Sequence, residues 1–274
     1  MTTRIQNVAL VVPPFAPLGI PCLGVAALAG GLKARGIPCR TFYWSFRILR
    51  DLPATTVKRR AYMYSSLSGS SMWPFNEWVF AGPLYPNGEL SDRELETRKA
   101  LRARMRGTPT QLPAGADSLL HLRALAPKWI TEMADELEPY DLIGVNTTFF
   151  QNIPALALLK EIKRRWPQKV TVLGGANCDD TMGGGLLEHF SQLDYVFGGE
   201  VDHSFPEFCA RLARGESVTD LPGLFYRDSS GVVRGGPAPP VEDMDALPIP
   251  DYDDLVAERE RFGLHELGDL MLAL

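Results

Sequence analysis

The sequence lacks the short motifs that mark the commonest metal and nucleotide sites. Its four cysteines lie far apart, so no pair has the spacing of a metal site or a redox dithiol. Its four histidines form no HExxH motif and no other paired ligand spacing. No P-loop is present, and the first predicted turn, from Pro13 to Gly19, carries prolines in place of the GxGxxG triplet of dinucleotide-binding folds. We therefore assign no metal ligand and no catalytic residue.

The chain also lacks an excess of basic residues and any long apolar run. Its formal net charge is −5, whereas a protein that binds the nucleic-acid backbone normally carries a basic patch. The N-terminal segment MTTRIQNVALVV has one arginine, and its apolar run is far too short for a signal peptide or a membrane span. These absences predict a cytoplasmic protein that binds neither nucleic acid nor a membrane.

Apolar strands that alternate with helices are the main pattern that the sequence does contain. Five short runs are typical of buried strands, at residues 8–12, 39–43, 141–147, 169–173 and 194–197. Helices are predicted over 23–36, 153–166, 182–190 and 205–214, with Ser204 as the N-cap of the last. Gly30 and Gly31 weaken the first helix, so we expect them to pack closely on the sheet. The alternation predicts an α/β protein with a doubly wound parallel sheet of five strands.

Two regions depart from this alternation. Residues 45–138 contain an aromatic, loop-rich stretch, a charged helix near 92–106 and a further helix over 118–138, so they read as an insertion. After residue 215 we expect a hairpin about Asp228 to Gly231, followed by an extended linker in the proline-rich acidic segment PAPPVEDMDALPIPDYDDL. The predicted domains are residues 1–215 with the insertion, 216–254 as hairpin and linker, and 255–274, which end in LMLAL as though another strand began there.

Three turns of the predicted sheet are suited to binding a ligand. In an open parallel sheet, ligands bind outside the carboxyl ends of the strands. There the third, fourth and fifth strands end in Asn146-Thr147-Thr148, in Gly174-Gly175-Ala176-Asn177 and in Gly198-Gly199-Glu200. Glycine lets the backbone approach a ligand closely, and the polar residues offer hydrogen bonds. These turns predict a polar groove, although turns of this kind also serve chain reversal alone.

Six segments, taken in order along the chain, resemble a known family. They are PPFAPLGIPCLGVAALAGGLKARGI, NEWVFAGPLY, GVNTTFFQN, VLGGANCDDTMGGGLLEHF, DYVFGGEVDHSFPEF and PPVEDMDALPIPDYDDL. Over nearly its whole length the chain resembles the N-terminal half of cobalamin-dependent radical SAM enzymes, and most closely the C-methyltransferases that mature ribosomally made peptides. The resemblance implies a methylcobalamin-binding module of such an enzyme. Its implied partners are cobalamin and either a precursor peptide or a separate radical SAM subunit.

The same resemblance implies a flavodoxin-like domain with the corrin across the carboxyl edge of the sheet and the nucleotide tail descending beside it. On this basis the residues that line the cobalamin site are Pro14, Phe15, Leu18, Gly19, Thr147, Thr148, Gly174, Gly175, Asn177, Gly199 and Glu200. The aromatic insertion, with Trp73, Trp78 and Phe80, either covers part of that site or forms a satellite core.

The chain departs from the family pattern in three ways. The DxHxxG motif is absent, so no histidine is a candidate lower axial ligand of cobalamin. Val201 stands where the fifth turn would usually have a second glycine. The CxxxCxxC motif, whose cysteines bind the [4Fe-4S] cluster that holds S-adenosylmethionine in the family, is also absent. We therefore expect an N-terminal fragment or a truncated gene product that does not methylate a substrate by itself.

Two other functions stay open. One is a non-catalytic α/β interaction or scaffold domain that has lost its ligand and binds a partner through the aromatic insertion or a basic helical face, which comprises Lys160, Lys163, Arg164 and Arg165. The other is a complete enzyme that uses a nucleotide cofactor, for which neither a phosphate loop nor an acid/base pair is present.

Overall fold

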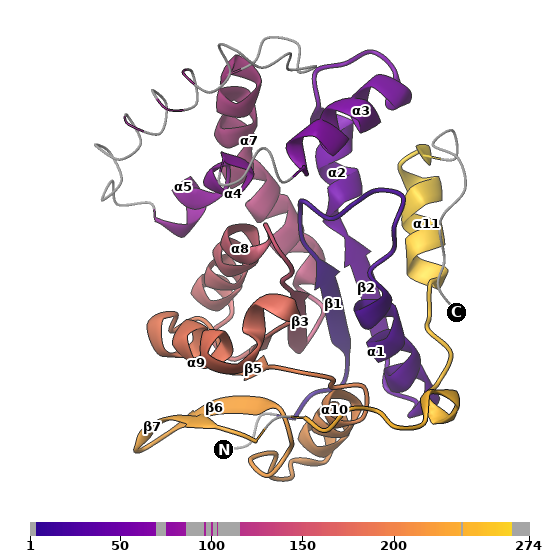
Figure 1. The fold of residues 1–274 in the computed structure, drawn as a ribbon, viewed down its shortest axis with the longest axis vertical. Coiled ribbons are helices and arrows are strands. Elements are labelled where there is room, and N and C mark those ends of the chain that lie inside the picture. Colours follow the sequence, from indigo (N-terminus) through magenta and orange to yellow (C-terminus); the bar gives the residue numbers. More distant parts are fainter. Residues whose placement is uncertain are drawn as a thin grey trace.

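The computed structural model describes residues 4–69, 75–85, 116–236 and 238–264, together with the single residues 96, 100 and 103. Within them, seven strands form one sheet in the order β2-β1-β3-β4-β5-β6-β7 (Figure 1). The strands are β1 (Val8–Val12), β2 (Cys39–Tyr43), β3 (Leu142–Asn146), β4 (Val170–Gly174), β5 (Tyr195–Phe197), β6 (Leu224–Asp228) and β7 (Gly231–Arg234). Apart from those three single residues, the charged helix predicted near 92–106 lies outside the described residues, as do Trp73 and the final LMLAL segment.

The five predicted strands are confirmed, and they run parallel to one another. Their order, β2-β1-β3-β4-β5, is that of a flavodoxin-like doubly wound sheet. The bounds of β1 and β2 agree with the prediction, and the other three strands begin one residue later than predicted. Every residue of β1 is buried, as is typical of a central parallel strand with helices on both of its faces.

The expected sheet of five parallel strands is nevertheless too small, because the hairpin belongs to the same sheet. The predicted turn is confirmed, since Asp228 pairs with Gly231 where β6 runs into β7. The strand β6 then pairs antiparallel with β5 and places Phe225 opposite Val196. Both of these side chains are buried, and the pairing protects the backbone edge that β5 would otherwise expose. The result is a mixed sheet of seven strands.

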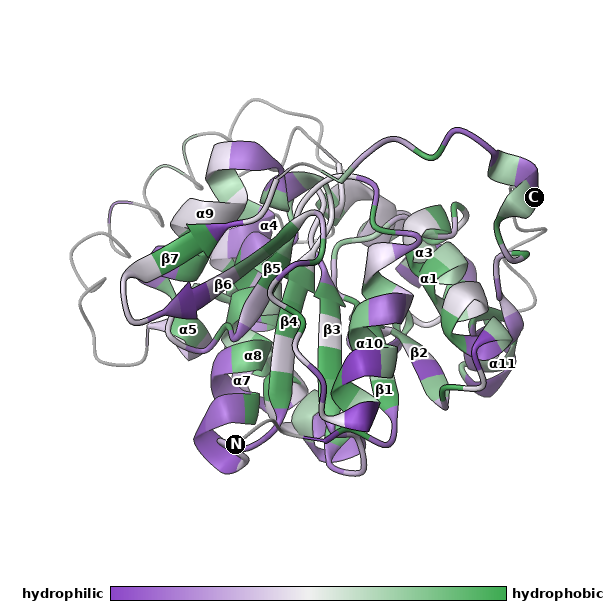
Figure 2. Ribbon diagram, turned by 90° about the horizontal axis from the view of Figure 1, so that it is seen from below, coloured by the Kyte–Doolittle hydropathy of each residue, from purple (hydrophilic) through white to green (hydrophobic). Residues whose placement is uncertain are grey.

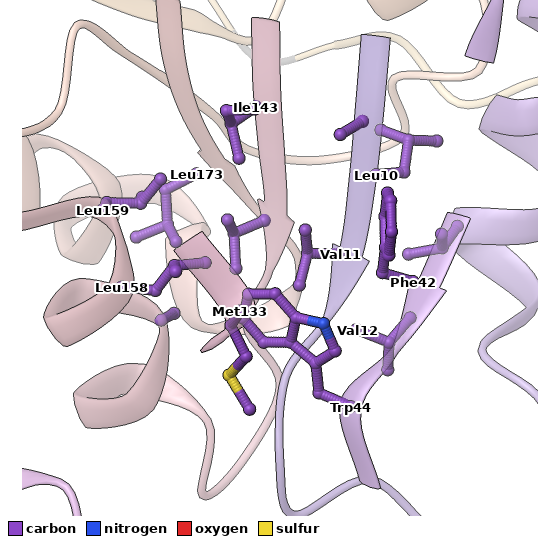
Figure 3. Close-up of a cluster of buried hydrophobic side chains, with 14 of the residues drawn as sticks. Leu10, Val11, Val12, Phe42, Trp44, Met133, Ile143, Leu158, Leu159 and Leu173 are labelled. Atoms are coloured by element: carbon purple, nitrogen blue, oxygen red, sulfur yellow. The ribbon is translucent and has the colours of Figure 1, made fainter. Parts of the chain in front are cut away.

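Helices cover both faces of the sheet. On one face lie α1 (Leu23–Ala34) and α10 (Ser204–Arg214), which pack against each other, and α10 lies over β1 and β3 in Figure 2. On the other face α7 (Ala116–Leu137) packs against α8 (Asn152–Arg165). Figure 3 shows Met133 and Leu158 from these two helices in one cluster with strand residues Val11, Ile143 and Leu173. The helix α9 (Asp180–His189) packs against β5, β6 and β7.

The start of α10 differs from its predicted start by one residue. Its N-cap is His203, whose side chain makes no capping hydrogen bond, so the prediction that Ser204 caps the helix is wrong. Ser204 is instead the first helical residue, and its buried Oγ has no hydrogen-bond partner. The difference arises because the helix extends toward the β5 turn, where the amide of Phe205 donates to the carbonyl of Val201.

Residues 238–252 of the proline-rich segment are extended and also dock on α1, whereas its last three residues, Asp253 to Leu255, form the start of a helix and not the predicted linker. We call residues 238–252 the strap; it contains one short 3₁₀ turn, η3 (Met244–Ala246), and passes α10 toward α11 (Figure 1). Gly30 does pack closely, although not on the sheet: a Cβ there would lie 2.2 Å from the carbonyl oxygen of Ile249 in the strap. Gly31 likewise faces Pro206 of α10. The amide of Asp251 donates to the carbonyl of Ala26 at 2.9 Å, which fixes the strap on the helix.

The last described helix, α11 (Asp253–Arg261), covers the opposite edge of the sheet from β7. The amide of Thr41 in the edge strand β2 donates to Asp254 Oδ2 at 2.7 Å. Glu258 is buried and pairs with Arg40 of the same strand at 3.4 Å. These contacts satisfy backbone and charged groups that β2 would otherwise present to solvent.

Between β2 and β3 the chain forms α2 (Trp44–Asp51), α3 (Val57–Leu67), α4 (Phe75–Trp78), α5 (Ala81–Leu84) and α7. Most described aromatic residues of this region belong to the main core, whereas Tyr62 and Tyr85 are exposed. Phe80 is fully buried, and its ring centroid lies 6.1 Å from those of both Phe15 and Trp129. Trp78 is also buried, and Arg123 stacks on its ring. In the part of the chain described, no helix is both long and apolar enough to cross a membrane.

Candidate functional site

A cavity of about 270 Å³ opens between the sheet and the pair α1 and α10. Three residues that lie side by side in the register of β1, β3 and β4 form its floor: Leu10, Gly144 and Val172. Its apolar walls come from Val25 and Leu28 of α1 and from Phe205 of α10. A Cβ on Gly144 would lie 3.0 Å from Leu10 and 3.6 Å from Phe205, so a larger residue there would crowd these two side chains of the lining. The cavity therefore suits an apolar group.

The mouth of the cavity lies at the carboxyl ends of the strands. Here β1 is followed by a connection to β2 on one side while β3 lies on its other side, which is the reversal of strand order where ligands bind in open α/β sheets. The residues at the mouth are Asn146, Gly174, Gly175, Gly199, Glu200, Val201 and Asp202. The cavity thus joins the three turns that the sequence singled out to the space beneath α1 and α10.

A second hollow, of about 370 Å³, adjoins the mouth. It is bounded by the β4 and β5 turns and by Ala238 and Pro240 of the strap, and it shares Gly175, Gly199 and Glu200 with the first cavity. Among the described residues, neither hollow is lined by a lysine, arginine or histidine, whereas both have carboxylates. Because like charges repel, this mouth is poorly suited to a di- or triphosphate.

Four of the eleven predicted site residues line the cavity: Gly174, Gly175, Gly199 and Glu200. The other seven do not. Pro14 and Phe15 are buried, and Phe15 packs against Tyr64 in the core with 3% of its surface exposed. Leu18 is half-buried and Gly19 is exposed in the loop after β1. Thr147, Thr148 and Asn177 lie in the adjoining turns, and ligand contact by any of the eleven stays a prediction.

The polar side chains of the β3 and β4 turns bind one another. Asn177 Nδ2 donates to Thr147 Oγ1 at 3.0 Å and to the carbonyl of Phe149 at 2.9 Å. Thr147 Oγ1 in turn donates to Asn152 Oδ1 at 2.6 Å. Thr147 is fully buried, so this network joins the two turns before any ligand is present. The network makes the carboxyl edge of β3 and β4 a preformed surface.

Gln151 holds two turns of the site together, and the sequence analysis did not identify it. It is 4% exposed, and its Nε2 donates to the carbonyl of Pro13 at 2.8 Å. Its Oε1 accepts from Asn146 Nδ2 and from the amide of Thr148, each at 2.9 Å. The side chain therefore connects the loop after β1 to the turn after β3. The sequence offers one signal for Gln151, which is its position as a polar residue just before α8. Such a residue is expected to cap the helix, but the side chain of Gln151 makes no capping hydrogen bond and is free to bind the two turns.

Glu200 and Val201 take different roles at the β5 turn. Glu200 Oε2 accepts a hydrogen bond from the amide of Val241 at 2.7 Å, so this carboxylate holds the strap against the mouth. Val201 contributes its side chain to the cavity lining, where a glycine would leave the backbone accessible. Cys178 in the neighbouring β4 turn is fully buried, and burial, together with the charge of Asp179, raises the pKa of its thiol. A raised pKa makes that thiol a poor nucleophile.

Metal binding gains no support at this site. Among the residues that the structure describes, no three histidine, cysteine, aspartate or glutamate side chains are grouped closely enough to hold a metal ion.

The two glycines that end β4 are expected to respond differently to alanine. Gly175 has φ +110°, and a Cβ there would lie 2.5 Å from the carbonyl oxygen of Thr147, whereas a Cβ on Gly174 would lie 3.7 Å from its nearest atom. Gly175→Ala should therefore lower the free energy of unfolding by about 2–4 kcal/mol, through backbone strain and overpacking. Gly174→Ala should change it by less than about 1 kcal/mol. Urea unfolding measures both, and equal effects would contradict this account of the turn.

Comparison with known proteins was made at the level of sequence and of fold. No family model matches the sequence. An uncharacterized methyltransferase of Pyrococcus horikoshii is 26% identical over 130 residues, which are 47% of this chain and 28% of that protein. The chain is thus a distant relative of a methyltransferase.

Two solved structures resemble the chain over most of its length. TsrM of Kitasatospora setae, a radical S-adenosylmethionine methyltransferase solved with cobalamin and a [4Fe-4S] cluster, matches with a TM-score of 0.44 and 16% identity over 88% of this chain and 30% of its own. OxsB, a cobalamin-dependent S-adenosylmethionine radical enzyme solved with aqua-cobalamin and S-adenosylmethionine, matches with a TM-score of 0.54 and 13% identity over 94% of this chain and 25% of its own. The chain spans 25–30% of the length of these three proteins. It shares the fold of part of OxsB.

Proposed function

We propose that this chain is a cobalamin-binding module that serves a radical SAM C-methyltransferase acting on a ribosomally made peptide. The observation that carries the proposal is the apolar cavity that opens at the carboxyl edge of a flavodoxin-like sheet, next to a surface made of three joined turns. The fold shared with part of OxsB supports it. Methylcobalamin, when bound, supplies a cobalt-held methyl group, and the residues of this chain would bind and orient that cofactor.

The lining of the site fits the two parts of cobalamin. The flat, apolar base of the nucleotide tail matches the cavity between α1 and α10, where Val25, Leu28 and Phe205 supply the walls. The corrin would lie outside, where Gly174 and Gly199 leave room for close approach. Its amide side chains are hydrogen-bond donors that suit the carboxylates at the mouth, and its tail carries a single phosphodiester charge where a di- or triphosphate carries more.

Exposed apolar side chains gather in the segments that follow the carboxyl ends of the strands. They are Ile20 and Leu23 after β1, Phe149 after β3 and Met182 after β4, with 56%, 46%, 74% and 54% of their surface exposed. Apolar side chains left in water around a cavity are typical of a ligand site. A broad, flat ligand with apolar surface would cover them.

Methyl transfer itself is assigned to another polypeptide or segment in this proposal. The sequence contains no CxxxCxxC motif, and no group in the cavity lining forms an acid/base pair for catalysis. The activity proposed for this chain is therefore binding and presentation of the cofactor, and the peptide substrate belongs to the enzyme that it serves.

The alternative of a scaffold domain that has lost its ligand has less support. Arg164 and Arg165 pair with Glu161, and Lys163 pairs with Asp194, so much of the basic face is neutralised within the domain. The described aromatic residues Trp78 and Phe80 are buried. The basic face and these two aromatic rings are thus largely occupied, while the cavity remains open.

The test is retention of hydroxocobalamin after gel filtration, read from the corrin absorbance. The wild-type protein should retain the cofactor, and Gly24→Leu should reduce its affinity about tenfold or more, a loss of about 1.4 kcal/mol. Gly24 lines the cavity in the first turn of α1, and a Cβ there meets nothing within 4 Å, so the leucine enters open space at the cavity without displacing the fold.

Gly185→Leu is the matched control. Gly185 also lies in a helix, α9, with open space at its Cβ, but it does not line the cavity. This variant should bind as the wild type does. A folded wild-type protein that retains no cobalamin would refute the proposed function, and full retention by Gly24→Leu would remove the cavity from the site.

A further inference from the structure

We propose that Phe149 contacts the face of the bound corrin and that the β3 turn holds its ring at the carboxyl edge for this purpose. The inference rests on the proposed function, and it names a binding residue outside the eleven that the sequence singled out. It depends on the backbone of Phe149, on the hydrogen bonds around it and on the exposure of its ring.

Phe149 adopts a backbone conformation that phenylalanine disfavours. Its φ is +52°, in the left-handed region that glycine and asparagine prefer. Such a conformation persists only where the surrounding structure enforces it, and it is often found at ligand sites. The backbone strain at Phe149 must therefore be offset by its surroundings in the fold or by binding of a ligand.

Burial does not compensate for this strain. The side chain is 74% exposed, and the described ring contact is with the neighbouring Phe150, at 6.2 Å between centroids. A phenylalanine usually stabilises a fold by removing its ring from water, and this ring gains little in that way. Glycine at this position would satisfy the backbone better, so the fold alone does not account for an aromatic residue here.

The hydrogen bonds on either side of Phe149 explain how the conformation is kept. Its carbonyl accepts from Asn177 Nδ2 of the β4 turn at 2.9 Å. The amide of the preceding Thr148 donates to Gln151 Oε1 at 2.9 Å, and Gln151 is itself bound to the carbonyl of Pro13 after β1. The turns on both sides of β3 in the sheet thus hold the segment, and they are the same turns that flank the proposed site.

The ligand that this arrangement fits has an extended apolar face. The contact of an exposed aromatic ring is most favourable in free energy when the ring packs on a flat surface of comparable size. Dispersion attraction and the removal of both surfaces from water then both contribute. Ile20 and Met182, from the segments after β1 and β4, are exposed apolar residues as well. A corrin macrocycle offers such a face, and this face is broader than the base of a free nucleotide.

The experiment compares Phe149→Gly, Phe149→Trp and the wild type for hydroxocobalamin affinity and for Tm. Phe149→Gly should weaken binding about tenfold or more while leaving Tm unchanged or raising it, because glycine relieves the strain at positive φ. Phe149→Trp should keep affinity within about threefold of the wild type, since it restores a large aromatic face. Val256→Gly, at another exposed apolar residue, in α11, should not alter affinity.

The outcomes separate this inference from the proposed function. Wild-type protein that binds no cobalamin would overturn both. Wild-type protein that binds, with Phe149→Gly binding equally well, would overturn the role of Phe149 alone. A parallel loss of Tm and affinity in Phe149→Gly would show that the residue serves the fold, which also contradicts the inference. Weaker binding with an unchanged or higher Tm would support it.

Discussion

Gln151→Glu is expected to retain hydroxocobalamin at about pH 5 and to lose most of it at about pH 8. A protonated carboxyl can still donate to the carbonyl of Pro13 and accept from the amide of Thr148, as the amide does now at 2.8 and 2.9 Å. The ionised carboxylate has no donor, so it would repel the Pro13 carbonyl and separate the loop after β1 from the β3 turn. We expect about 2–4 kcal/mol of lost stability at the higher pH, typical of a buried unpaired charge.

The direction of this pH dependence follows from burial. Position 151 is 4% exposed, so burial would raise the pKa of a new carboxyl there above its unfolded value of about 4.3. A group with a raised pKa in the folded state favours folding in its protonated form. The variant should therefore match the wild type most closely below about pH 4.3 and lose stability progressively as the pH rises through the folded-state pKa.

Gln192→Glu provides a matched control at a distance from the site. Gln192 is also buried, at 9% exposed, and its Nε2 donates to a backbone carbonyl, that of Leu156, at 3.3 Å. It lies just before β5, at the opposite end of that strand from the mouth. This variant should show a pH-dependent Tm without a pH-dependent affinity among folded molecules. Equal affinity changes in both variants would mean that Gln151 supports only the fold. Hydrogen exchange of residues 13–19, compared between the free wild-type and Gln151→Glu proteins, would reveal whether Gln151 holds the loop after β1.

Gly30→Val is expected to release the strap from α1. A Cβ at Gly30 would lie 2.2 Å from the carbonyl oxygen of Ile249, so the strap backbone must move. The free energy of unfolding should fall by about 2–4 kcal/mol, from overpacking and from loss of the hydrogen bond between Asp251 and Ala26. Faster hydrogen exchange over residues 238–252, measured by mass spectrometry, should accompany the lower stability in urea.

Release of the strap should also weaken cofactor binding in the proposed function. Ala238 and Pro240 bound the outer hollow, and Glu200 is tied to Val241, so a displaced strap removes one wall of the mouth. Gly185→Val is the control, because it places the same β-branched residue inside a helix where a Cβ meets nothing within 4 Å. The control should keep the stability of the wild type or gain slightly, because valine is a better helix former than glycine. Unchanged exchange of the strap in Gly30→Val would show that its contact with α1 is dispensable.

Much of the fold was predictable because parallel strands leave a local signal. A strand covered on both faces, such as Val8–Val12, is a short continuous apolar run, and its bounds were predicted correctly. The glycines that end β4 and β5 could be placed at the carboxyl edge for the same reason. Gly174, Gly175, Gly199 and Glu200 indeed line the cavity.

The hydrogen bonds that shape the site could not be predicted in the same way. Gln151 binds a carbonyl 138 residues away, and Glu200 binds an amide 41 residues away. Contacts between a side chain and a distant backbone group follow no periodicity, so nothing in the sequence pairs them. The strained backbone of Phe149 is likewise a consequence of its neighbours, because phenylalanine would not adopt a φ of +52° from its own preference.

The sequence by itself determined the class of fold, the positions of the five parallel strands and the glycine turns that end them, since each depends on residues adjacent along the chain. Only the tertiary structure decided that the hairpin extends the sheet to seven strands, that the strap docks on Gly30, and that a cavity opens over Gly144 between α1 and α10. These features arise where elements from distant parts of the chain meet, and the space left between them is set by how they pack together.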